Sequence, residues 1–227
     1  MKLLVIDTAL SLCTAAVFEN GAALAVRSET MVKGHQERLA GFVREAMAEA
    51  GIGFDALDRI GVTTGPGSFT GLRVGLAFAQ GFGAALDRPV VGVSTLDALA
   101  ASLVGGLPSS GSVAALIDAR RGQVYARFWR DGIAEGPAEA LSLDAAAVRV
   151  AALGPEPTLV GSGAALLAQA CSTARIVDLT GPGPAALARL VAAADPRLAP
   201  PEPQYLRAPD ATPPTRMPGQ PRVPVLS

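Results

Sequence analysis

A glycine-rich stretch from Gly65 to Leu86 limits what this chain can fold into more than any other part of it. The stretch reads GPGSFTGLRVGLAFAQGFGAAL and follows the strand-like run Ile60–Thr64. Glycine and proline together predict a tight turn, and serine and threonine are good N-cap residues for a helix that follows. We therefore predict a strand, a turn and a helix in succession, with a structural turn made by Gly65, Pro66, Gly67, Ser68 and Gly71.

The helix predicted after this turn carries only small residues on one face. Gly75, Ala79 and Gly83 recur at every fourth position. Glycine inside a helix costs about 1 kcal/mol relative to alanine, so we expect another backbone to pack very close to this face. The sequence leaves two candidates for that neighbour: the chain's own sheet and a helix of another protein.

A second helix, predicted at His35–Ala50, has an apolar stripe at helical spacing. Such a stripe normally belongs to the core of a domain, although two such helices also suit a protein interface. The interface residues that we predict are Leu39, Phe42, Val43 and Met47 on this helix, and Leu72, Gly75, Ala79 and Gly83 on the next.

Composition and charge narrow the class of protein. The chain has 227 residues, half of them apolar, and a net charge of -1 without a basic block. Proteins that grip nucleic acid by themselves need clustered lysine and arginine, so we do not expect this one to do so. We see no signal peptide, and the apolar helix at Leu72–Leu86 is too short to span a bilayer. We predict a cytoplasmic protein without a membrane segment, whose Cys13 and Cys171 are free thiols.

The order of the predicted elements indicates an α/β protein with two halves. The first half reads strand, strand, strand, helix, strand, helix, strand, helix, and a cluster of breakers at 105–111 follows it. The second half opens as the first does, with an apolar strand that ends in aspartate, Ile117-Asp118 in place of Ile6-Asp7. Residues 200–227 hold 9 of the 18 prolines, which excludes regular structure. We predict an N-terminal lobe at 1–106, a C-terminal lobe at 107–199 and an extended or disordered tail at 200–227.

The residues at the two strand ends are candidates for nucleotide binding. Asp7, Thr8, Ser11 and Asp118 would flank a nucleotide from two lobes, or would simply be turn residues. The glycine turn is neither a P-loop, because it has no lysine, nor a dinucleotide fingerprint, because Gly71 comes one residue late.

The sequence gives little support to a metal site or to a serine nucleophile. His35 is the chain's one histidine, so a metal site built on two histidines is excluded, and two distant cysteines do not form a zinc site. Ser68 as a nucleophile would depend on His35, and a helix cap is the preferred interpretation of this serine.

Four segments together resemble the bacterial TsaB (YeaZ) family: LLVIDTALSLCTAAV, GPGSFTGLRVGLAFAQGFGAALDRPVVGVSTLDALA, IDARRGQVY and PEPQYLR. They extend from the first strand to the tail, and GPGSFTGLRVG is the most specific of them. The resemblance implies the two-lobed fold of actin, sugar kinases and heat-shock chaperones (the ASKHA fold), with a mixed sheet and flanking helices in each lobe.

The resemblance also implies a function. TsaB-like chains are non-catalytic partners of a paralogue, TsaD, which with the ATPase TsaE makes threonylcarbamoyladenosine beside the tRNA anticodon. It implies that the helices at His35–Ala50 and Thr70–Leu86 bind TsaD, that the same surface forms a homodimer when TsaD is absent, and that tRNA is contacted only indirectly. TsaD holds its metal through a His-x-x-x-His helix, and the matching positions here are Thr95 and Leu99. We therefore expect no catalytic residues, no metal, and no nucleotide outside the full complex.

An independent enzyme is the alternative interpretation. It would be an ATP-dependent phosphotransferase or a peptidase-like enzyme of the same fold, with Asp7, Thr8 and Asp118 around the nucleotide. Nucleotide-using relatives usually have glycine two residues after the first aspartate, and this chain has Ala9.

Overall fold

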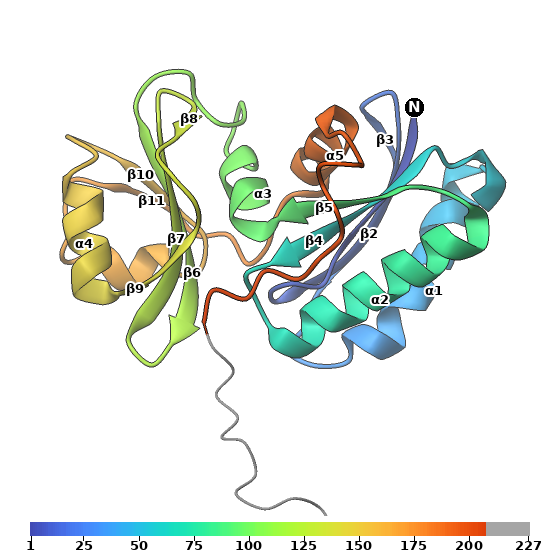
Figure 1. The fold of residues 1–227 in the computed structure, drawn as a ribbon, viewed down its shortest axis with the longest axis horizontal. Coiled ribbons are helices and arrows are strands. Elements are labelled where there is room, and N and C mark those ends of the chain that lie inside the picture. Colours follow the sequence, from blue (N-terminus) through green and yellow to red (C-terminus); the bar gives the residue numbers. More distant parts are fainter. Residues whose placement is uncertain (208–227) are drawn as a thin grey trace, which may run out of the picture.

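The fold consists of two mixed β-sheets with flanking helices, arranged as two lobes (Figure 1). The computed structural model describes residues 1–207, so the part of the predicted tail at 208–227 lies outside the described residues. The division of the chain into lobes at 106 and 107 stays a prediction. The last helix, Pro184–Ala193, returns to pack on the first sheet.

The first sheet has the strand order β3-β2-β1-β4-β5. Its first three strands are antiparallel, and β1, β4 and β5 run parallel because helices connect them. The strands are β1 (Lys2–Asp7), β2 (Leu12–Glu19), β3 (Ala22–Thr30), β4 (Arg59–Gly65) and β5 (Val90–Ser94).

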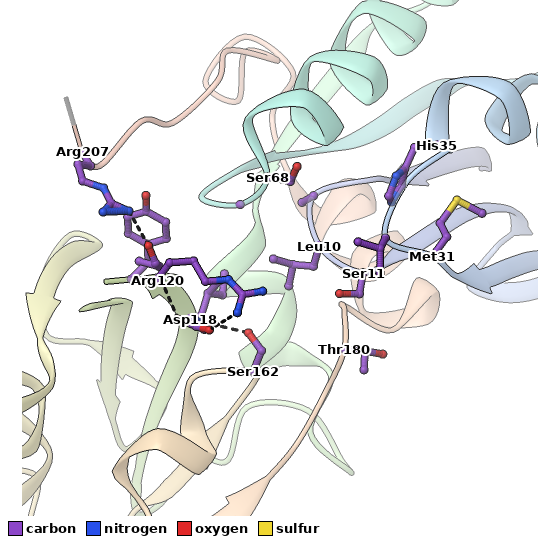
Figure 2. Close-up of a pocket in the computed structure, with 16 residues that line it drawn as sticks. Leu10, Ser11, Met31, His35, Ser68, Asp118, Arg120, Ser162, Thr180 and Arg207 are labelled. Atoms are coloured by element: carbon purple, nitrogen blue, oxygen red, sulfur yellow. Dashed lines mark hydrogen bonds and ion pairs between the residues drawn. The ribbon is translucent and has the colours of Figure 1, made fainter. Parts of the chain in front are cut away.

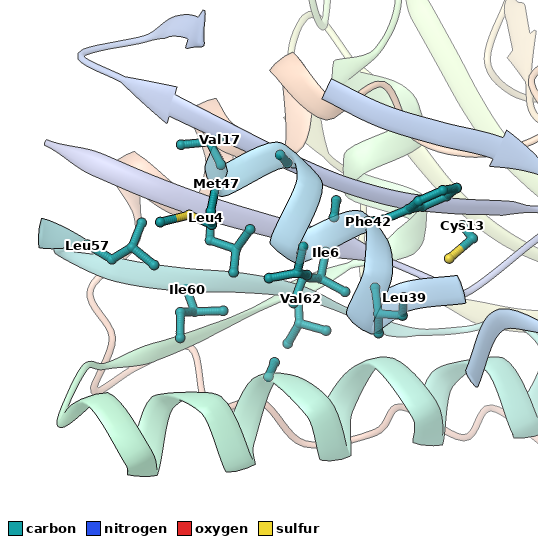
Figure 3. Packing of buried hydrophobic residues seen from close by; sticks show 14 of the residues in the cluster. Leu4, Ile6, Cys13, Val17, Leu39, Phe42, Met47, Leu57, Ile60 and Val62 are labelled. Carbon is teal, nitrogen blue, oxygen red and sulfur yellow. The ribbon is translucent and has the colours of Figure 1, made fainter. Parts of the chain in front are cut away.

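Helices cover both faces of this sheet. On one face α1 (His35–Ala50) and α2 (Phe69–Leu86) lie side by side, and on the other lie α3 (Thr95–Ala101) and α5 (Pro184–Ala193) (Figure 1). A short 3-10 helix, η1 (Phe54–Ala56), precedes β4. Figure 3 shows the core under α1, in which Leu39, Phe42 and Met47 pack on strand residues such as Leu4, Ile6 and Val62.

The second sheet has the order β11-β10-β6-β7-β8, and β9 also pairs with β7. Its central hairpin, β6 (Ser112–Arg120) and β7 (Gln123–Arg130), carries the second strand-end aspartate. The other elements of this lobe are β8 (Ile133–Ala134), β9 (Glu139–Ser142), α4 (Leu143–Ala151), β10 (Thr158–Val160), η2 (Ala164–Leu167) and β11 (Arg175–Val177).

The predicted order of elements in the first half is confirmed, with its strand, turn and helix at Gly65 to Leu86. The Ser68 hydroxyl caps α2 by accepting a hydrogen bond from the Gly71 N–H at 3.3 Å. The second half was predicted less completely. The residues that follow Gly161-Ser-Gly163 predict a helix at 164–170, where the structure has only the short 3-10 helix η2, and we did not predict α4.

The eight residues predicted as an interface are all buried in the interior of the protein. The α1 stripe packs on the first sheet together with Ala79, and Leu72 is also buried. A Cβ at Gly75 would lie 2.4 Å from Thr8 Oγ1, and one at Gly83 would lie 2.3 Å from Val90 Cγ2. The residue-level prediction is therefore corrected: these residues are buried inside the chain, where the closest neighbours of the glycines are the side chains of Thr8 and Val90.

Candidate functional site

A cleft of about 410 Å³ lies where the two lobes meet (Figure 2). The first lobe contributes the loop after β1, the loop before α1 and the turn before α2. The second lobe contributes the β6–β7 hairpin and the segment after β10. The residues that carry polar groups into it are Ser11, His35, Ser68, Asp118, Arg120, Tyr125, Ser162, Thr180 and Arg207.

The charged wall of the cleft belongs to the β6–β7 hairpin. Arg120 Nη1 pairs with Asp118 Oδ2 at 3.1 Å, and the Arg120 backbone N–H donates to Asp118 Oδ1 at 2.7 Å. Asp118 in turn donates its backbone N–H to Ser162 Oγ at 3.2 Å. Arg120 and Arg121 both have positive φ, 62° and 56°, where side chains are strained. The hairpin thereby directs the Arg120 guanidinium into the cleft (Figure 2).

Asp7 and Thr8 do not line this cleft, unlike Ser11 and Asp118. Both are buried, and the Thr8 hydroxyl is already used, since it donates to the Gly71 carbonyl at 2.7 Å. Burial raises the pKa of Asp7 to about 6, because the charged carboxylate has lost its water. Of the four predicted nucleotide-proximal residues, the structure thus brings only two to the open cleft.

The glycines of the turn have a packing role. A Cβ at Gly67 would lie 2.3 Å from the Ala9 carbonyl oxygen, and one at Gly71 would lie 2.1 Å from that of Thr8. The turn therefore sits directly on the loop after β1, at Thr8 and Ala9, next to the buried Asp7 in the sequence. Sequence reasoning recognised the turn but had no signal for what it covers.

The positions that would hold a metal in TsaD carry no ligand here. Thr95 and Leu99 are fully buried on α3. Within residues 1–207, no group of three His, Cys, Asp or Glu side chains is placed to hold a metal ion.

The outer face of α1 and α2 is the second candidate site. Two glycines, Gly41 and Gly81, lie in the interior of these helices. Among the described residues, a Cβ at Gly81 would meet nothing within 4 Å, and one at Gly41 would meet only the end of the Glu45 side chain. The residues exposed around them are Ala40, Arg44 and Ala48 on α1, and Thr70, Arg73, Ala77 and Ala84 on α2. We did not predict this face, because the buried glycines on the opposite side of α2 gave a stronger periodic signal.

Comparison with known proteins decides the family. A Pseudomonas aeruginosa crystal structure, described as an uncharacterized protein with similarity to peptidase YeaZ, is 31% identical and superimposes with a TM-score of 0.75, over 91% of this chain and 99% of that one. The chain belongs to the TsaB (YeaZ) family. The TsaB of Escherichia coli, a tRNA threonylcarbamoyladenosine biosynthesis protein, is 36% identical over 58% of this chain and 56% of its own length.

Other relatives extend this picture of a TsaB family member. An uncharacterized protein of Mycobacterium bovis is 38% identical over 92% of this chain and 93% of its own. Residues 26–132 match the family model of TsaD, described as tRNA N6-adenosine threonylcarbamoyltransferase. The predicted ASKHA fold is confirmed. In the part of the chain that the structure describes, no helix is long and apolar enough to cross a membrane.

Proposed function

We propose that this TsaB-family chain is a non-catalytic subunit that binds a TsaD paralogue and supports threonylcarbamoyl transfer to the anticodon-adjacent adenosine of tRNA. In this proposal TsaE is the ATPase of the assembled complex, tRNA is contacted only indirectly, and the chain acts in the cytoplasm. The family membership supports the pathway, since its named members are biosynthesis proteins for this nucleoside.

One observation carries the partner role: Gly81 lies exposed in the middle of α2 with open space around it. A glycine at such a position costs about 1 kcal/mol relative to alanine, and no contact among residues 1–207 requires it. Gly41 lies in the neighbouring helix under almost the same conditions. Small residues on adjacent helices allow the backbone of a partner helix to approach closely, as ridges fill grooves in helix packing. We assign the TsaD contact, and the homodimer formed without TsaD, to this outer face.

The test is a bulky side chain on the outer face. Gly81→Leu should weaken binding of TsaD at least about 100-fold, as expected when a clash is built into a close helix contact. The fold should be unaffected, because the new side chain points into open space. Binding is measured by calorimetry and by light scattering of the chain alone and mixed with TsaD.

Ala145→Leu provides the matched control, since Ala145 is an exposed helical alanine on α4, in the other lobe. It should leave binding unchanged. If Gly81→Leu binds TsaD as tightly as the unmodified chain does, the outer face of α1 and α2 is not the contact. A chain that ignores TsaD altogether would refute the partner role itself.

The cleft argues against an independent ATP-dependent enzyme. A phosphotransferase of this fold would need its first-lobe aspartate at the nucleotide, and Asp7 is buried and does not line the cleft. We expect ATP turnover by the isolated chain at the background rate. Turnover that disappears in Asp7→Asn would overturn this assignment.

A further inference from the structure

The segment Ala199–Arg207, which we call the strap, leaves α5 and runs along α2 toward the second lobe (Figure 1). It is proline-rich and has no regular secondary structure. Four hydrogen bonds nevertheless hold it to the first lobe. Gly92 N–H donates to the Ala199 carbonyl at 2.9 Å, Gln80 Nε2 to the Pro201 carbonyl at 2.8 Å, Gln204 N–H to the Thr64 carbonyl at 2.7 Å, and Arg73 Nε to the Tyr205 hydroxyl at 3.4 Å.

Two glycines of the first sheet make room for the strap backbone. A Cβ at Gly92 would lie 2.4 Å from the Pro200 carbonyl oxygen, and one at Gly65 would lie 2.9 Å from that of Gln204. Real Cβ atoms do not approach backbone oxygens so closely, so the sheet is shaped to receive the strap. Tyr205 then packs on Phe69, with ring centroids 5.6 Å apart.

The far end of the strap is anchored in the second lobe. Arg207 Nη2 donates to the Ala119 carbonyl, and Nη1 donates to Gln123 Oε1 at 3.2 Å. The guanidinium also lies 6.0 Å from the centre of the Tyr125 ring. All three partners belong to the β6–β7 hairpin, which forms the charged wall of the cleft.

The strap is a third connection between the lobes, separate from the two chain crossings, and its hold on the second lobe is non-covalent. The chain first crosses after α3 and returns before α5, and these two crossings are tied together where Gly183 N–H donates to Ser102 Oγ at 2.8 Å. Beside them, Arg127 of β7 pairs with Asp97 of α3 at 2.6 Å. A buried apolar cluster of α3, β6 and β7 residues, with Leu10 packed against it, lies at the same junction, and any rotation of the lobes would pivot about this cluster. The strap reaches the hairpin at the other end of the cleft, away from α3 (Figure 1).

We infer that the strap is an interlobe clamp that sets the width of the cleft. While Arg207 holds the β6–β7 hairpin, the lobes cannot rotate about the crossings near α3. When Arg207 is detached, the hairpin and the first lobe move apart and the cleft widens. This inference concerns the chain by itself and does not depend on the proposed binding of TsaD.

The test removes one anchor at a time in the full chain. Arg207→Ala removes the attachment to the second lobe, and Gly92→Ala forces the strap away from the first. Spin labels at Gln36→Cys on α1 and Ala145→Cys on α4, with Cys13 and Cys171 replaced by alanine, report the distance between the lobes. We expect both anchor variants to broaden this distance distribution toward longer values. Amide exchange in the loop after β1 and in the β6–β7 hairpin should become about tenfold faster, as expected for local opening.

Matched control variants distinguish release of the clamp from a general loss of stability. Arg197→Ala removes an exposed arginine that pairs locally with Asp195, and Gly136→Ala places a methyl group in open space. Both should leave distance and exchange unchanged. Arg207→Lys keeps the charge but not the paired donors, so it should give an intermediate effect and serves if the alanine variant does not fold. A distance distribution that stays narrow in both Arg207→Ala and Gly92→Ala would overturn the inference.

Discussion

Thr63 and Asp7 form a buried hydrogen bond at the carboxyl ends of β4 and β1, in which Thr63 Oγ1 donates to Asp7 Oδ1 at 2.7 Å. The Ala9 N–H donates to the same oxygen at 3.1 Å. The other carboxyl oxygen, Oδ2, is buried without a hydrogen-bond partner among the described residues. Two donors on one oxygen do not replace the water that a carboxylate loses, so burial dominates the titration of this group.

The stability of the protein should depend on pH through Asp7. Its pKa is raised from the usual 3.8 to about 6, so the folded chain binds this proton more tightly than the unfolded chain does. The free energy of unfolding should therefore fall by about 3 kcal/mol as the pH rises from about 4 to about 6, and stay level at higher pH. Asp7→Asn should remove this step, because asparagine accepts the same two hydrogen bonds and does not titrate. Urea unfolding at pH values from 4 to about 8 measures both profiles.

Asp87→Asn is the control for this experiment. Asp87 is exposed at the end of α2 with a φ of 51°, a conformation that asparagine also adopts readily. Its pH profile should follow that of the unmodified chain. A step that persists in Asp7→Asn would assign the pH dependence to another group.

The two faces of α2 should respond oppositely to an added methyl group. Gly75→Ala places a Cβ 2.4 Å from Thr8 Oγ1, and this hydroxyl is held by its bond to the Gly71 carbonyl. We expect a loss of about 1 to 3 kcal/mol in the free energy of unfolding. Gly81→Ala meets nothing within 4 Å, so it should stabilise the isolated chain by up to about 1 kcal/mol. Urea midpoints of the two variants compare them, and equal shifts would contradict the assignment of the faces.

The cap of α2 should contribute measurably to stability. Ser68→Ala removes the hydroxyl that accepts the Gly71 N–H, which should cost about 1 kcal/mol of unfolding free energy. Ser94 precedes α3 in the same way, yet its side chain makes no cap hydrogen bond. Ser94→Ala should therefore cost nothing. Thermal unfolding followed by circular dichroism distinguishes the two, and a loss confined to Ser94→Ala would refute this account.

The ion pair between Asp97 and Arg127 should show strong coupling. Desolvation raises the pKa of Asp97, and the guanidinium of Arg127 opposes that rise. Arg127→Ala leaves a half-buried carboxylate without its partner, which should cost about 2 kcal/mol at neutral pH. The double variant Asp97→Ala with Arg127→Ala should recover part of that loss. A double-mutant cycle in urea measures the coupling, and additive losses would show that the pair contributes nothing.

The predictions that succeeded rest on local chemistry. The succession of strand, turn and helix at Gly65 to Leu86 follows from glycine, proline and a capping serine within one short stretch. The sequence also holds a signal for α4 that we missed. Ser142 accepts a cap hydrogen bond from the Ala145 N–H, and Val150 lies on the buried side of the helix. The alanine-rich sequence around it hides the helical period.

The predictions that failed concern which surfaces of the protein pack against each other. The small-residue stripe at Gly75 and Gly83 predicts a close neighbour, but the nearest atoms belong to the side chains of Thr8 and Val90, which a pattern along one helix does not name. Asp7 at a strand end is visible in the sequence, whereas its buried hydrogen bond with Thr63 depends on a strand far along the chain. No local pattern contains that contact.

The sequence by itself determined the α/β class, the order of elements in the first half and the family, because these depend on periodicity and on motifs within single segments. Only the tertiary structure decided that the small face of α2 packs inward, that Asp7 is buried, and that the strap joins the lobes. The hydrogen bond from Gln204 N–H to the Thr64 carbonyl illustrates the reason. It joins two backbone groups far apart in the chain, and backbone groups are the same in every residue except proline, so their pairing is decided by how the whole chain folds.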